Sequence, residues 1–174
     1  MNHSFNRGAR PLLGQAVGVA PLSQSMEQER PQQDSTIFPL GLHRERLRFA
    51  NFSFTRTPSG QCNCEVSLEW DHEMFVGRAL GQSSPLGDFR VAAEAALHAL
   101  MTFAKGSIQF ELLGIKQMRA FDENLIIVSI SMRESGKLTR LVGCYLADGD
   151  SRRGAAVAVL NATNRVLGNY IAAQ

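Results

Sequence analysis

The chain is poor in the residues that cross-link a fold or bind metals. Its three cysteines, Cys62, Cys64 and Cys144, are an odd number without the spacing of a disulfide framework, which suits a reducing compartment. No second Cys pair or His-x-His lies near Cys62 and Cys64 to complete a metal site, so we predict no metal and no cofactor. The sequence also has no apolar run near the roughly 18 residues that a membrane-spanning helix needs. We therefore expect a cytoplasmic protein without a membrane partner.

Charge of one sign is also scarce. The 174 residues contain 18 Lys and Arg against 16 Asp and Glu, a net charge of +2. The basic residues are spread thinly, with Arg152-Arg153 the only adjacent pair, whereas a nucleic-acid-binding surface would cluster them. We therefore expect no nucleic-acid partner. The content of 44% hydrophobic and 20% charged residues is typical of an ordinary globular domain.

Residues 1–42 differ in composition from the remainder. They contain four of the six prolines and many glutamines, and they have no sustained apolar period of a strand or a helix. Such a segment cannot bury enough apolar surface to offset the entropy lost on ordering. We predict a disordered Pro/Gln-rich tail over 1–42 and a folded domain over 43–174.

The folded part reads as one unit written twice, with copy one over 44–105 and copy two over 106–174. In each copy three strand-like segments precede a helix with the pattern A-A-x-A-x-L-x-A, which begins at Ala92 in the first copy and at Ala155 in the second. A repeated unit of this kind buries its apolar faces against its neighbour or a partner. We predict an α+β fold of order βββα-βββα, with antiparallel strands and the two helices packed on a shared sheet layer.

Two features of each copy could serve either structure or binding. Gly77 and Gly143 occupy matching positions in the third strand, where a glycine permits close approach by a helix or by a small ligand. Asp88 and Asp150 lie where the helices begin, so they could cap the helices or bind a ligand ammonium group. The sequence leaves both interpretations open.

The string from Ala156 to Arg165 resembles the last helix of the regulatory, leucine-sensing and dimerisation domain of 2-isopropylmalate synthases. The turn from Gly77 to Gly81, followed by Pro85, is similar to that domain's G-x-A-x-G-x-G-P-x-D-A turn. The resemblance covers about residues 45–172 and implies a doubled βββα domain that forms a homodimer. The synthases also need a catalytic barrel with a metal-binding His-x-His. This chain has neither, so the resemblance implies a regulatory domain standing alone.

The expected ligand site follows from the two matching strand-to-helix connections, because free N–H groups at a helix start attract anions. The predicted ligand-binding residues are Gly81, Pro85, Asp88, Gly143, Asp148 and Asp150. No nucleophile–base pair emerges from the spacing, so we predict no enzymatic activity. The function that we expect is a non-catalytic regulatory or dimerisation module that senses a small-molecule effector or binds a partner protein. Two alternatives are a hotdog-like acyl-CoA thioesterase, with Glu94 as its carboxylate, and an RNA-binding α/β module.

Deleting residues 1–42 should leave the melting temperature nearly unchanged, because the segment is predicted to add no packed surface to the domain. Thermal unfolding of the full and shortened chains, followed by circular dichroism, measures this. A fall of many degrees would show instead that the segment packs on the domain.

Overall fold

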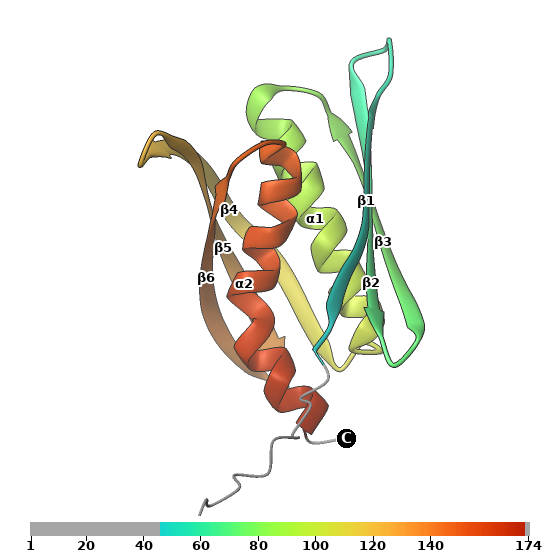
Figure 1. The fold of residues 1–174 in the computed structure, drawn as a ribbon. Coiled ribbons are helices and arrows are strands. Elements are labelled where there is room, and N and C mark those ends of the chain that lie inside the picture. Colours follow the sequence, from blue (N-terminus) through green and yellow to red (C-terminus); the bar gives the residue numbers. More distant parts are fainter. Residues whose placement is uncertain (1–45, 173–174) are drawn as a thin grey trace, which may run out of the picture. The chain divides into compact units, whose positions relative to one another are not determined.

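The computed structural model describes residues 46–172, so the predicted tail over 1–42 and the first residues of the predicted domain lie outside the described residues. Figure 1 shows how the elements are arranged. In chain order they are β1 (Arg48–Arg56), β2 (Gln61–Trp70), β3 (Glu73–Gln82), α1 (Pro85–Phe103), β4 (Ile108–Ala120), β5 (Glu123–Glu134), β6 (Lys137–Ala147) and α2 (Ser151–Ala172). The predicted α+β class and the order βββα-βββα are confirmed.

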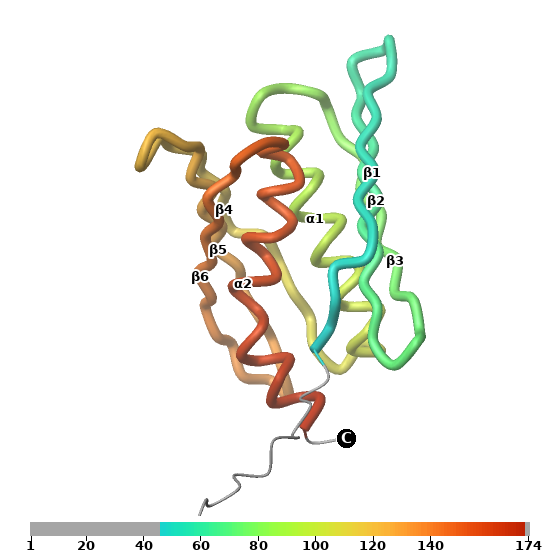
Figure 2. Tube along the Cα trace, in the orientation of Figure 1, coloured from blue at the N-terminus to red at the C-terminus, as the bar shows by residue number. Residues whose placement is uncertain are grey.

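The strands form two sheets rather than one shared layer, which corrects that part of our expectation. One sheet has the order β1-β2-β3 and the other β4-β5-β6, and all neighbouring strands are antiparallel. The helices lie between the sheets, as Figure 2 shows, with α1 against β2 and β3 and α2 against β5 and β6. The helices also pack against each other, and α1 reaches β4 of the other copy. Because α1 is buried on more than one side, it needs cover from both sheets.

The strands follow the alternation of their sequence. On β2 the residues Cys62, Cys64, Val66 and Leu68 are fully buried against the helices, whereas every second residue from Gln61 points outward. Each sheet contains tight two-residue hairpins whose central residues have positive φ, as type I′ turns require. These residues are Asp71 and His72, Phe121 and Asp122, and Ser135 and Gly136.

Both copies contain a β-bulge at the same place in their first strand. The register of β1 with β2 shifts between Phe49 and Asn51, and that of β4 with β5 shifts between Leu112 and Gly114. The sequence predicts the first bulge, because the apolar alternation of Leu47 and Phe49 changes phase at Ala50-Asn51 before Phe52 and Phe54. It did not predict the second. A bulge bends and twists its strand, so the two first strands share this irregularity as well as their order.

The two matching glycines allow the helices to cross directly over the sheets. A Cβ atom at Gly77 would overlap the α1 backbone at Ala95 and Ala99, and one at Gly143 would overlap the α2 backbone at Ala158. Of the two interpretations, helix crossing is therefore the one that the structure shows. The alanines of the repeated pattern permit the same close approach from the helix side.

The substitutions Gly77→Ala and Gly143→Ala should each lower the free energy of unfolding by roughly 1–3 kcal/mol, because the added methyl group must push a helix off its sheet. Urea unfolding monitored by circular dichroism measures the loss. Gly149→Ala is the matched control, because a Cβ atom added there would have no neighbouring atom within 4 Å. Equal losses in all three variants would contradict this packing argument.

Candidate functional site

The two strand-to-helix connections that we predicted as a ligand site lie at the same end of the layered structure. Both helices begin at this end in Figure 1. The charge of Asp88 in the first connection contributes to raising the pKa of Arg152 in the second, after the larger effect of its hydrogen bond to Asp150. The starts of the two helices thus lie near enough for the charge of Asp88 to act on Arg152.

Asp88 is a buried ion-pair partner rather than the cap of α1. The cap is Ser84, whose Oγ accepts a hydrogen bond from the backbone N–H of Gly87 at 2.9 Å, and Pro85 begins the helix. Asp88 is only 1% exposed. Its carboxylate accepts hydrogen bonds from Ser83 Oγ at 3.0 Å and from the guanidinium of Arg56 at the end of β1.

Burial and neighbouring groups shift the pKa values of Asp88 and of the cysteines Cys62 and Cys64. Burial by itself would raise the pKa of Asp88, but the hydrogen bonds from Arg56 and Ser83 hold it below its usual value. Burial raises the pKa of Cys62, and the nearby charge of Asp88 adds to this effect. Burial likewise raises the pKa of Cys64 to about 12. Both thiols therefore stay protonated near neutral pH, where a thiol is a poor nucleophile.

In the second connection Asp150 is also engaged within the chain. Its Oδ1 accepts hydrogen bonds from the backbone N–H of Arg152 at 3.0 Å and from Nε of the same residue at 2.7 Å. Asp148 is exposed. Of the two predicted glycines, Gly143 lies under α2 and Gly81 faces the side chain of Val91. A ligand cation at Asp88 or Asp150 would have to displace Arg56 or Arg152 from the carboxylate.

A groove that was not predicted from the sequence lies between α2 and the strand β1. This groove has a volume of about 1080 Å³. Its apolar lining includes Phe49 of β1, Trp70 of β2 and Leu160 of α2. Its charged lining consists of Arg46, Arg153 and Arg165 and includes no acidic residue. We refer to this hollow below as the β1–α2 groove.

The β1–α2 groove exists because the two copies do not pack in the same way. In copy one α1 packs along β4, and Arg90 donates a hydrogen bond to the carbonyl of Leu112 at 3.3 Å. In copy two the equivalent Arg153 lies over the ring of Phe49, 5.0 Å from its centroid, but α2 does not pack along β1 to the same extent. The long arginine side chain therefore bridges a space that direct helix–strand contact closes in copy one.

Burial of equivalent leucines shows the same asymmetry. Leu97 on α1 is 2% exposed, whereas Leu160, at the same place in the repeated pattern, is only partly buried. Nearby, α2 carries Asn164 where α1 carries Met101. The sequence signal for the groove was this replacement of an apolar residue by a polar one at equivalent positions of the two helices. Another polar residue of α2, Asn161, donates from Nδ2 to the carbonyl of Cys144 at 2.9 Å, so it ties the helix to β6.

Trp70 differs from the other groove residues in its hydrogen bonding. Its ring packs edge-on against Phe103, with centroids 5.6 Å apart and an interplanar angle of 76°. Its Nε1 is the one buried side-chain nitrogen or oxygen within residues 46–172 that has no hydrogen-bond partner. Buried indole N–H groups usually find an acceptor, so this donor is an exception that needs an explanation.

The remaining chemistry-bearing residues do not gather into a site. His98 Nδ1 lies 2.6 Å from the carbonyl oxygen of Arg78, and Glu94 forms an ion pair with Arg90 at 3.0 Å. Within the described residues no three His, Cys, Asp or Glu side chains cluster closely enough to hold a metal ion. None of the helices in that part of the chain has the length and hydropathy needed to cross a membrane.

Comparison with known proteins adds no family. No protein-family model matches this chain, and a search of curated proteins returns no significant match. The resemblance to the regulatory domain of 2-isopropylmalate synthases therefore stays a prediction from the sequence.

The substitution Arg56→Ala should lower the free energy of unfolding at pH 7 by about 1–3 kcal/mol, because it leaves the buried Asp88 carboxylate without its cation. The folded pKa of Asp88 is depressed, so its contribution is present above the unfolded pKa and lost as the pH falls through the folded pKa. The difference between wild type and variant should therefore shrink below about pH 4.

Urea unfolding over a pH series measures this difference. The control is Arg78→Ala, which removes a pair with Glu65 in which the Arg78 side chain is 69% exposed, and it should cost at most about 1 kcal/mol. A difference for Arg56→Ala that does not change with pH would refute the role assigned to the Asp88 carboxylate.

Proposed function

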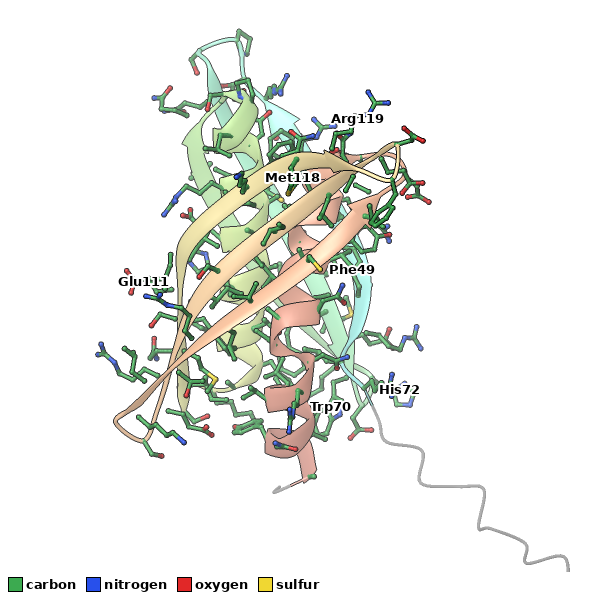
Figure 3. The ribbon with its side chains drawn as sticks, turned by 90° about the vertical axis from the view of Figure 1, so that its left-hand side faces the viewer. Phe49, Trp70, His72, Glu111, Met118 and Arg119 are labelled. Carbon is green, nitrogen blue, oxygen red and sulfur yellow. The ribbon has the colours of Figure 1, made fainter. Side chains whose placement is uncertain are left out.

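We propose that this chain is a non-catalytic regulatory module that assembles as a homodimer through the outer face of its second sheet. The observation that carries the proposal is the apolar character of that face, which Figure 3 views from the front. Its partly or fully exposed apolar residues are Leu113, Met118, Leu125, Ile127, Leu138, Val142 and Leu146. Among them Leu138 is 64% and Val142 65% exposed.

The outer face of the first sheet also exposes apolar residues, Met74 and Leu80, but fewer of them, and it is crossed by ion pairs. Two ion pairs cross it, Arg48 with Glu69 at 3.3 Å and Arg78 with Glu65 at 2.7 Å. No ion pair crosses the outer face of the second sheet in the described part of the chain. An antiparallel sheet usually turns one polar face to water, so the apolar face of the second sheet fits contact with another protein surface.

A second copy of the chain is the partner that this face suits best. A twofold dimer joins the same patch from both subunits, so a patch with a central apolar strip can complement itself. On β4 this face carries Met118 near one end and the acidic Glu111 towards the other, as labelled in Figure 3. The basic residues Lys116, Arg133 and Arg140 also lie on this face, around the apolar residues. The resemblance to a dimerisation domain, which the sequence suggested, agrees with this choice.

The state of the reactive groups supports a non-catalytic role. Burial keeps Cys62 and Cys64 protonated, as their raised pKa values indicate, and Glu94 is neutralised by Arg90. No histidine is placed beside a hydroxyl or thiol in the hydrogen bonds that residues 46–172 form. General acid–base or nucleophilic catalysis needs such a placement.

The two alternative functions receive less support. A hotdog fold wraps one helix in all its strands, whereas here each sheet is followed by its own helix. An RNA-binding sheet would present aromatic and basic residues, but on β2 the outer face carries Glu65 and Glu69. The regulatory proposal needs neither feature.

Regulation would act through the packing of the dimer. The strand β6, which supplies Val142 and Leu146 to the outer face, continues into the connection that contains Asp148 and Asp150. A small-molecule effector or a partner protein that changes this connection would favour one packing of the dimer over another. Such a ligand shifts the population only as far as its affinities for the two packings differ.

The substitution Val142→Asp should convert a dimer into a monomer, because it places a charge in the centre of the proposed interface. Light scattering across micromolar concentrations measures the mass, which is 19.1 kDa for one chain. The matched control is Val76→Asp on the outer face of the first sheet, which should stay dimeric. A wild-type chain that is monomeric throughout this range would refute the proposal.

A further inference from the structure

We infer that the β1–α2 groove binds a small amphipathic anion, a molecule with one carboxylate or phosphate head and an elongated apolar body. This inference goes beyond the proposed dimer, because the groove lies between α2 and β1 and not on the outer face of the second sheet. It also differs from the connections that the sequence predicted as a ligand site.

The groove has the size and lining of a small-molecule site. Its volume of about 1080 Å³ lies just above the range typical of ligand pockets, roughly 300–1000 Å³. Phe49, Trp70, Leu160 and Ile171 supply apolar surface along it. Such a lining favours an apolar body that spans the groove lengthwise over a compact polar metabolite.

The charges in the groove select an anionic head. Arg46, Arg153 and Arg165 line it, and none of them forms an ion pair with a carboxylate of residues 46–172. Of the other arginines in the described part, five form such pairs, and Arg119, Arg133 and Arg140 do not. The stacking of Arg153 on Phe49 leaves its N–H edge available, and a guanidinium edge binds a carboxylate or phosphate through paired hydrogen bonds.

The unpartnered indole of Trp70 is the second, independent observation. Its Nε1 is buried without an acceptor, although the residue itself lines the groove. A buried donor without a partner is costly to a fold, so such a group calls for an explanation, of which a bound ligand is one. Within the proposal, an oxygen of the ligand is the acceptor that this N–H lacks in the described residues.

The repeated fold does not by itself produce the β1–α2 groove, because the equivalent place in the other copy has none. The equivalent space between α1 and β4 is closed, and Leu97 there is 2% exposed. The opening in copy two depends on its own residues, including the polar Asn164 and the cationic Arg165 on the helix wall.

A second copy of the chain is a poor occupant of the groove. A twofold contact would bring the same surface of both subunits together, so the three arginines would face one another. Like charges in such a contact oppose association. The observations therefore favour a small anion over self-association at this place.

The test uses the full chain and two probes, dodecanoate and dodecyl phosphate, below their micelle concentrations. Trp70 is the single tryptophan of the chain, so its fluorescence reports directly on the groove. We expect a saturable change in its emission, with the same dissociation constant from calorimetry. The probe that binds more tightly identifies the head group. Dodecyltrimethylammonium, which has the same apolar body and the opposite charge, should not bind.

Variants locate the binding. The double substitution Arg153→Gln and Arg165→Gln should weaken the binding of the tighter probe at least tenfold, because two guanidinium partners are lost. Val157→Phe, which narrows the groove from the α2 side, should also weaken it. The matched control is Arg119→Gln on β4, outside the groove, and it should bind like wild type. Unchanged circular dichroism spectra and melting temperatures show that each variant is folded.

Three results would overturn the inference. The first is the absence of saturable binding by either anion, and the second is equal binding of the cationic probe. The third is dissociation of the dimer into monomers when a probe is added, measured by light scattering. This result would show that a second copy of the chain occupies the groove. The Val142→Asp variant separates this inference from the proposed function, since a monomeric variant should still bind the anions with unchanged affinity.

Discussion

The contact on which the rest of the structure depends is the backbone-to-backbone approach of each helix to its sheet. Gly77 and Gly143 provide no side chain at the crossing, and the alanines of the helices provide small ones. Each helix therefore lies close enough to its own sheet to leave room for the second sheet on its other side. Larger side chains at these positions would separate helix and sheet and expose the apolar faces that form the core.

The duplication also gives each helix a contact with the first strand of the other copy, and this contact differs between the two copies. In each copy the helix directs an arginine at the bulged first strand of the other copy, Arg90 at Leu112 and Arg153 at Phe49. The first contact accompanies close packing, and the second spans an open groove. A pair of equivalent surfaces can thus diverge in function through a few side chains while the backbone order stays the same.

Two surfaces of different chemistry result from this arrangement. The outer face of the second sheet exposes a group of apolar side chains and is crossed by no ion pair in the described chain, which suits association with a flat protein surface. The β1–α2 groove is concave, aromatic and cationic, which suits a small ligand. The helix α2 lies between these two surfaces, because it packs on the inner side of β5 and β6 and forms a wall of the groove. A change in the groove could reach the sheet through this helix.

The sequence by itself determined the order of the elements, the alternation on β2, the first bulge and the matching positions of the two glycines. These features depend on neighbours along the chain or on a pattern repeated within it, so local periodicity records them. Only the tertiary structure decided that there are two sheets and that helices rather than a ligand approach the glycines, because periodicity tells which side of an element is apolar and not what covers it. The same limit applies to the pairing of Asp88 with Arg56, which are 32 residues apart, and to the groove beside Trp70. Both arise from the distance between packed elements, which depends on many side chains at once.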